Sequence, residues 1–437
     1  MNINLKYIIA VYIIFVFSVS FAQNQENNLL TLDDVIKLTI KNYPLIKQNE
    51  QQLLAAQFRV EQQKSEYLPN INAQASYTRI GPIPAFSFGG ENLDLAPADN
   101  YNIAVFLHQT LYDFGKRNSQ VEYATSFLKS VKDNEELIKT DLSNQAVNIF
   151  FGILFLEKSI AVKDSQYSTL QEHLKIAELK IKNGAATDYD ALSTKTRMIA
   201  IQNENIDLQN EKHNQELALK ELIGLNRQKG ISITGYFDLP RFDLNNDSLL
   251  NVAYNERPEM KIAIDVQNTA KLQKEMVDQI DNPILSADLS YGFKNGYEPN
   301  INVIRGNWVA SFSVGVPIFN GSLTKKKVNE VKANIDAIDQ NIDQVKQNIS
   351  TNIYQATENL KTSVSKINLT KDQIDYAKQS LERANLQYQL GAGTNLEVLD
   401  AETALTQARL LNIQALYKSI INYYSLRRAA GDKIFND

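Results

Sequence analysis

Four segments of the chain alternate apolar and polar side chains strictly. They cover about 70–78, 101–111, 284–293 and 307–317, and in the first of them Ile71, Ala73 and Ala75 alternate with polar residues. A period of two is typical of a β-strand with one face in water. Each segment has about the ten residues that a tilted strand needs to cross a membrane.

The apolar faces of these strands carry aromatic residues beside the connecting loops: Tyr77, Tyr101, Tyr291, Phe293 and Trp308. Aromatic rows of this kind form the girdles of outer-membrane barrels. Two hairpins packed on a soluble core are the alternative, although the rest of this polar chain offers no large core to cover them. Four strands cannot close a barrel, and an open edge in lipid is costly, so several chains would share one barrel.

Helical periodicity extends from about 115 to 182 and from about 322 to 390. At 1.5 Å per residue each helix would be on the order of 100 Å long, far beyond a globular core. The last helix has two apolar seams on nearly opposite sides, one through Leu399 and Ile420 and one through Val398 and Leu405. Two seams require a neighbour on each side, so we expect a single-layer wall of helices around a lumen.

Glycine turns interrupt the helices at Gly184 and at Gly391 and Gly393, and they mark an internal repeat. Gly184 and Gly391 are 207 positions apart, and so are Gly224 and Gly431. Two copies of one plan therefore fill most of the chain. We assign 23–224 to the first repeat, 225–258 to an equatorial linker, 259–431 to the second repeat and 432–437 to a short tail.

The N-terminal residues 1–22 have the features of a secretory signal peptide, with cleavage expected after Ala22. We expect no later segment to cross a bilayer as a helix. The chain has a net charge of −5, no cysteine and three scattered histidines. This composition argues against nucleic-acid binding, disulfides and cysteine-ligated metal sites, and we expect neither metal nor cofactor.

The stretch Leu390 to Leu405, LGAGTNLEVLDAETAL, is similar to a motif of the TolC family of outer-membrane efflux proteins. Strand-ending LYDFG at Leu111 and PIFNG at Pro317 occur in the matching order. The resemblance implies an α+β membrane protein: a trimer with a twelve-stranded barrel, four strands per protomer, continued by a long periplasmic α-helical barrel. It also implies a passive exit duct in the outer membrane, not an enzyme, which meets a periplasmic adaptor and an inner-membrane pump.

Carried over residue by residue, the resemblance makes Asp190 and Tyr388 a periplasmic gate and makes Glu397 and Asp400 an acidic entrance ring. Gly393 departs from the family, because some members have an arginine there that adds a second gate link. Helix-start charge is an alternative role for all three acids. Tyr388 could equally be a packing residue.

Three questions stay open on the sequence alone. An exported soluble coiled-coil scaffold or adhesin would explain the long helices, although not the amphipathic strands. Drug, metal and protein cargo are all compatible with a duct. The basic residues Lys116, Arg117 and Lys325 to Lys327 follow strands that leave the membrane. They could contact phospholipid headgroups of the outer-membrane lipid, or simply be solvated.

Overall fold

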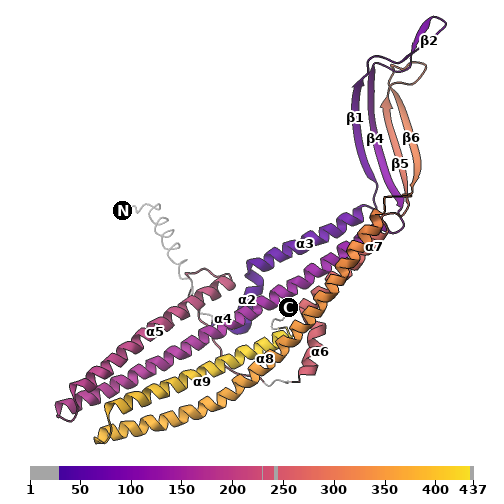
Figure 1. Cartoon of the computed structure of the whole chain (residues 1–437). Helices are drawn as coiled ribbons and strands as arrows, with labels where there is room; N and C mark the ends of the chain where they lie inside the picture. The colour runs from indigo at the N-terminus through magenta and orange to yellow at the C-terminus, as the bar shows by residue number, and fades with distance from the viewer. Residues whose placement is uncertain (1–28, 229, 241–244, 434–437) are drawn as a thin grey trace, which may run out of the picture.

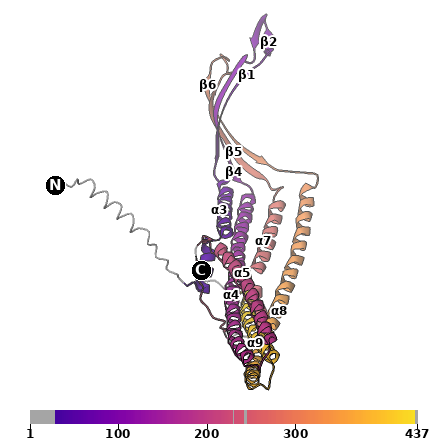
Figure 2. The same ribbon diagram turned by 90° about the vertical axis from the view of Figure 1, so that its left-hand side faces the viewer.

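The structure is a computed structural model that describes residues 29–228, 230–240 and 245–433. The predicted signal peptide, 1–22, lies outside the described residues. A long body of helices is followed at one end by a separate four-stranded sheet (Figures 1 and 2). The described elements fall into two similar halves.

The two halves match element by element. The first contains α2 (Leu32–Asn42), α3 (Pro44–Ser65), β1 (Asn70–Arg79), β4 (Asp99–Tyr112), α4 (Lys116–Lys182) and α5 (Asp188–Leu222). The second contains α6 (Asn246–Glu256), α7 (Pro258–Asp278), β5 (Ile284–Lys294), β6 (Arg305–Gly315), α8 (Leu323–Leu390) and α9 (Asn395–Ala429). Helix α6 corresponds to α2 and has the same length of 11 residues. The second half therefore begins inside the segment that we assign to the linker.

Local chemistry explains where the helices begin and end. Pro44 and Pro258 occupy the first turns of α3 and α7, where a missing N–H costs nothing. Gly184 and Gly391 adopt left-handed backbone, with φ of +72° and +77°, and end the two longest helices. Gly393 sits in a tight place: a Cβ there would lie 3.0 Å from Gln387 Cβ and 3.2 Å from Tyr388 N, so a larger residue would require small shifts of its neighbours.

The sheet has the strand order β1-β4-β5-β6, and all neighbours are antiparallel. Between β1 and β4 the chain adds a small hairpin that the sequence pattern did not predict, formed by β2 (Ala85–Phe88) and β3 (Glu91–Asp94). The helices cover neither face of the main sheet (Figure 2). Its two outer strands, β1 and β6, each pair on one side only within the described chain.

The principal core lies in the middle of the helical body, where α2, α4, α5 and α9 meet. Phe150 of α4 is buried there among Val147, Leu219 and Ile420. Residues of the predicted equatorial linker pack onto this core: the ring centroids of Phe237 and Phe151 are 6.0 Å apart, and Ile233 forms a parallel bridge with Leu30.

Contrary to our expectation, α4 is long and apolar enough by composition to cross a membrane. Half of its apolar window is buried inside the protein, as in a core helix.

The two seams of α9 have the neighbours that the spacing requires. Val398 and Leu405 pack against Leu381 and Tyr388 of α8. On the other side, Leu399 packs against a cluster from α4 and α5 that comprises Leu170, Met198 and Ile201. The α9 helix therefore packs against its own partner α8 on one side and against the α4–α5 hairpin on the other, and so joins the two hairpins.

Replacing Phe150 by alanine tests this core. The side chain is 1% exposed, so the cavity should cost about 3–5 kcal/mol of unfolding free energy. The measurement is chemical unfolding followed by circular dichroism of the helices. Lys158→Ala on the same helix is exposed and should shift the midpoint little; equal effects of the two changes would contradict the packing described.

Candidate functional site: the helical tips

The turns that contain Gly184 and Gly391 end the two helical hairpins side by side, at the end of the body far from the sheet (Figure 1). The two following helices start with capping boxes. Thr187 and Asp190 form the box of α5, and Thr394 and Glu397 form the box of α9. Both hairpin tips are thus built by the same local chemistry.

A buried amide joins the tips of the two hairpins. The Asn395 side chain of α9 accepts a hydrogen bond on Oδ1 from His173 Nε2 of α4 at 2.6 Å, and Thr194 Oγ1 lies 3.5 Å from the same oxygen. Its Nδ2 donates to Asp190 O at 3.2 Å and to Ser193 Oγ at 3.0 Å. All these donors and acceptors lie at the contact between α9 and the α4–α5 hairpin, so separating the hairpins would break the whole set.

Tyr388 packs beside this junction. Its ring centroid lies 4.9 Å from that of His173, and the Lys180 ammonium lies 4.6 Å from its centre. Lys180 also donates to the Tyr388 carbonyl oxygen. Burial raises the pKa of the Tyr388 phenol, and the negative charge of Asp190 raises it further.

The structure gives the expected gate pair, Asp190 and Tyr388, no direct hydrogen bond. The Tyr388 hydroxyl is buried without a partner, while the Asp190 carboxylate accepts from Thr187 N at 3.2 Å. Asp190 therefore caps its own helix, and its backbone carbonyl makes the link to Asn395. The packing role that we held open for Tyr388 accounts for all the contacts that its ring makes here.

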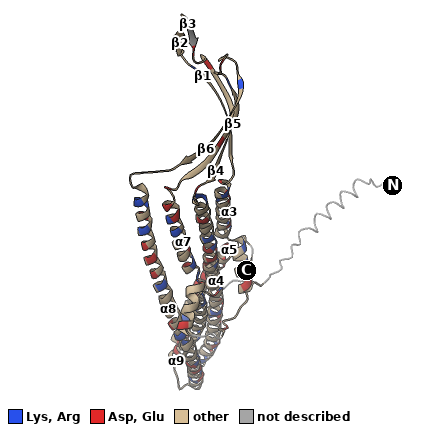
Figure 3. Ribbon diagram, turned by 90° about the vertical axis from the view of Figure 1, so that its right-hand side faces the viewer, with Lys and Arg blue, Asp and Glu red and all other residues tan. Residues whose placement is uncertain are grey.

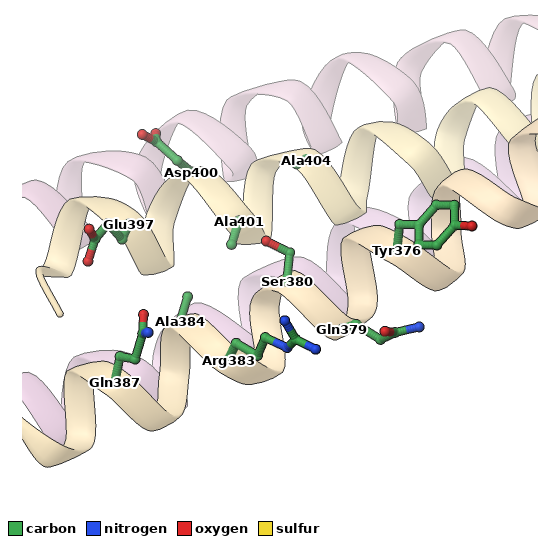
Figure 4. Close-up of a pocket in the computed structure, with 10 residues that line it drawn as sticks. All are labelled: Tyr376, Gln379, Ser380, Arg383, Ala384, Gln387, Glu397, Asp400, Ala401 and Ala404. Atoms are coloured by element: carbon green, nitrogen blue, oxygen red, sulfur yellow. The ribbon is translucent and has the colours of Figure 1, made fainter. Parts of the chain in front are cut away.

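Glu397 and Asp400 are exposed and line a groove of about 710 Å³ between α8 and α9 (Figure 4). Glu397 also caps α9, accepting from Thr394 N at 2.8 Å. Arg383 of α8 lines the same groove and makes no ion pair with any described residue. The groove thus has two anionic groups and one cationic group.

Sequence reasoning missed His173 and Asn395, and the reason is physical. They lie 222 positions apart, and each alone looks like a polar residue on a helix surface. A signal was present nonetheless. Asn395 directly follows the capping threonine of the most specific motif, at a position that the helical period places on a buried face.

The five predicted girdle residues lie on one face of the sheet, at the end far from the helices. Tyr77 pairs across the strands with Tyr101, and Tyr291 pairs with Trp308. Phe293 opposes Ile103, two residues beyond Tyr101 on the same face. Charged residues concentrate on the helices and are few on the sheet (Figure 3).

The basic residues at the sheet–helix junction are only partly available to a lipid. Arg117 is buried, donates to Asp113 Oδ2 at 2.6 Å and lies over the Tyr67 ring. Lys116 lines a pocket of about 610 Å³ at the same junction. Of this pair, Lys116 is the residue that stays free to meet a phosphate. Within the described residues no group of three His, Asp or Glu side chains could hold a metal ion.

Comparison with known proteins identifies the family. The sequence model of the family described as "Outer membrane efflux protein" matches residues 35–225 and 249–432. The chain therefore belongs to the outer membrane efflux protein family. It is 21% identical over 405 residues to the outer membrane protein TolC of Vibrio cholerae serotype O1, covering 89% of both chains.

Solved structures share the fold. The outer membrane protein VceC of Vibrio cholerae superposes with a TM-score of 0.77 at 18% identity, covering 92% of this chain and 96% of that one. The CmeC outer membrane channel of Campylobacter jejuni gives 0.78 at 19% identity, covering 93% and 86%. The open-state MtrE channel of Neisseria gonorrhoeae gives 0.73 at 17% identity, covering 93% and 90%. The predicted family, efflux function and outer-membrane location are confirmed, and nothing supports the soluble scaffold.

Asn395→Leu tests the junction between the hairpins. The change removes the four contacts of the amide and leaves the His173 N–H buried without an acceptor, which costs about 1–3 kcal/mol. We expect at least a tenfold rise in the open-to-closed ratio of single channels in planar bilayers. Tyr388→Phe removes only an unpartnered hydroxyl and should change that ratio little. A larger change of the ratio in Tyr388→Phe than in Asn395→Leu would instead support Tyr388 and Asp190 as the gate.

Acid should weaken the same junction. Burial lowers the pKa of His173 below its ordinary value of 6.5, and the bond to Asn395 opposes this shift only in part. The stability that neutral His173 contributes is therefore complete above pH 6.5 and is lost as the pH falls through the lowered pKa. As the pH falls below 6.5, the open-to-closed ratio of the wild type, divided by that of His173→Gln, should rise. Identical acid responses in the two proteins would rule out this role.

Proposed function

We propose that three copies of this chain form a passive duct through the outer membrane, with a twelve-stranded barrel and a continuous periplasmic helical wall. The observation that carries the proposal is the open sheet. Strands β1 and β6 both lack a partner on their outer side in the described chain. Unpaired backbone groups in lipid cost several kcal/mol each, so β1 of one copy would pair with β6 of the next.

The dimensions of the sheet fit a bilayer. A second aromatic group lies at the helix end of the strands, with Tyr112, Phe114 and Phe319 exposed. Tyr101 and Tyr112 bound the β4 span, and about 3.4 Å per residue gives roughly 37 Å along the strand. At a tilt of ~40° this is about 28 Å across the membrane, close to the height of the apolar band of such barrels.

The helical body also offers surfaces for a second copy. On α5 exposed apolar residues recur at heptad spacing: Leu192, Ile199 and Ile206 are all more than half exposed. On α8 Leu369 and Tyr376 are seven residues apart and exposed by 67% and 73%. These stripes have the spacing of coiled-coil seams. We infer that α5 of one copy packs against α8 of its neighbour and completes a helical barrel.

The duct itself would do no chemistry, and a partner pump would supply the energy of transport. A periplasmic adaptor and an inner-membrane pump are the partners that the family resemblance implies, and the exposed tips are where they would dock. Repetition of Glu397 and Asp400 by threefold symmetry would place acidic groups around the entrance. Rings of negative charge favour cations and repel anions.

Ile199→Asp/Ile206→Asp tests the assembly. Burying two carboxylates per seam should abolish the trimer, so the purified protein should run as a monomer in light scattering and give no channels in planar bilayers. Arg197→Asp changes the charge on another side of α5 and should leave the trimer intact. Trimers and wild-type channels from the double variant would exclude the α5–α8 contact, and a monomeric wild type without channels would refute the duct.

A further inference from the structure

A buried acid lies between the apolar clusters that hold α9 in the wall. Glu402 is 2% exposed and lies between Leu399 and Leu405, which pack in the two clusters on either side of α9. Its Oε1 atom accepts from Thr406 Oγ1 at 3.4 Å, and its Oε2 atom has no hydrogen-bond partner. An ionised carboxylate with one weak hydrogen bond is costly in such a place.

Helix α4, which faces α9, contributes a second buried oxygen without a hydrogen-bond partner. Gln166 of α4 is 3% exposed, and its Oε1 atom is also without a partner. The helices α4 and α9 are antiparallel, and the contacts of His173 with Asn395 and of Leu170 with Leu399 fix their register. Seven residues further from the tip on each helix, the same register brings Gln166 opposite Glu402.

Two buried oxygen acceptors that the register places opposite each other would need a hydrogen between them. We propose that Glu402 is a proton-binding site at the α4–α9 contact: when protonated, its carboxyl group donates to Gln166 Oε1 and ties the two hairpins together. Release of the proton leaves an ionised Glu402 carboxylate facing the unpaired Gln166 Oε1, and this weakens the contact between α4 and α9. The proposal extends the proposed duct, because loosening this contact would free the tips to separate.

The surroundings favour the neutral acid. The side chains packed at this level are Leu170 on α4, Met198 and Ile201 on α5, and Leu381 on α8. Among the charged or titratable groups of the packed elements, Tyr167 of α4 packs against the same apolar cluster and His173 bonds to Asn395. Lys163 of α4 pairs with Glu204 of α5, and Lys195 of α5 pairs with Glu178 of α4. Arg409 of α9 donates to Ser165 Oγ, and Arg383 and Tyr376 of α8 line the groove between α8 and α9.

Burial raises the pKa of Glu402 from its ordinary value of 4.5 to about 7, against the smaller opposing effects of Arg409 and the Thr406 hydrogen bond. The closed arrangement therefore binds the proton more tightly than an exposed carboxylate would. Its stability should be highest below pH 4.5 and should fall as the pH rises from there through about 7. This response is opposite in sign to that of His173, so the two sites can be told apart.

Glu402→Gln keeps the size of the side chain and cannot ionise. Between pH 6 and pH 8 the open-to-closed ratio of wild-type channels, divided by that of Glu402→Gln, should rise about tenfold per protomer, as a group with a pKa near 7 requires. Glu382→Gln, an exposed acid on α8, should follow the wild type. Parallel pH profiles for the wild type and Glu402→Gln would overturn the proposal.

Two further measurements do not depend on channel activity. Infrared difference spectra of the wild type should show a carboxylic-acid carbonyl band at pH 6 that disappears by pH 8 and is absent from Glu402→Gln; Gln166→Leu should shift it to the frequency of a free acid. A band that is missing at pH 6, or replaced by a response to sodium or potassium, would refute a proton as the ligand.

The chain has no native cysteine, so Gln166→Cys/Glu402→Cys can be joined by a short thiol reagent. Failure to join would overturn the register.

Discussion

Unpaired backbone at the edges of a sheet is the constraint on which this structure depends. In water an edge strand can bond to solvent, whereas in lipid each unmet N–H or C=O costs several kcal/mol. The four strands of this chain are long enough to span a bilayer and too few to close. We propose that copies of the chain share strands for this reason. The long helices would then inherit the symmetry of the barrel, because each strand pair leads directly into one of them.

The helical part solves a related problem. A single layer of helices has no central core, so each helix must be held by its neighbours on both sides. Two apolar seams hold α9 to its neighbours along its length, and hydrogen bonds centred on Asn395 hold the tips together. Apolar seams resist separation whatever the pH. Polar contacts such as that of Asn395 can be broken at a defined cost, which makes them suitable for the tips, the part of the wall that we propose opens.

Much of the architecture could be predicted from the sequence, because it rests on local periodicity. The four strands and the glycine turns follow from patterns within a few residues, helix ends follow from Pro44 and Gly391, and the repeat follows from equal spacings between distant glycines. The junction could not be predicted in the same way. His173 and Asn395, or Gln166 and Glu402, become partners only when two helices pack in one register; a local pattern can place such a residue on a buried face but cannot identify its partner. The extra β2–β3 hairpin escaped notice because its strands have only four residues each.

The most direct test of the central claim is cross-linking between sheet edges, in a chain without native cysteine. One cysteine would replace Gln74 in the middle of β1, and a second would be moved along residues 309–313 of β6. At one register we expect disulfides between chains that stop at a covalent trimer in the outer membrane. Ladders that pass beyond three chains, or cross-links only within one chain, would contradict a shared barrel of three copies.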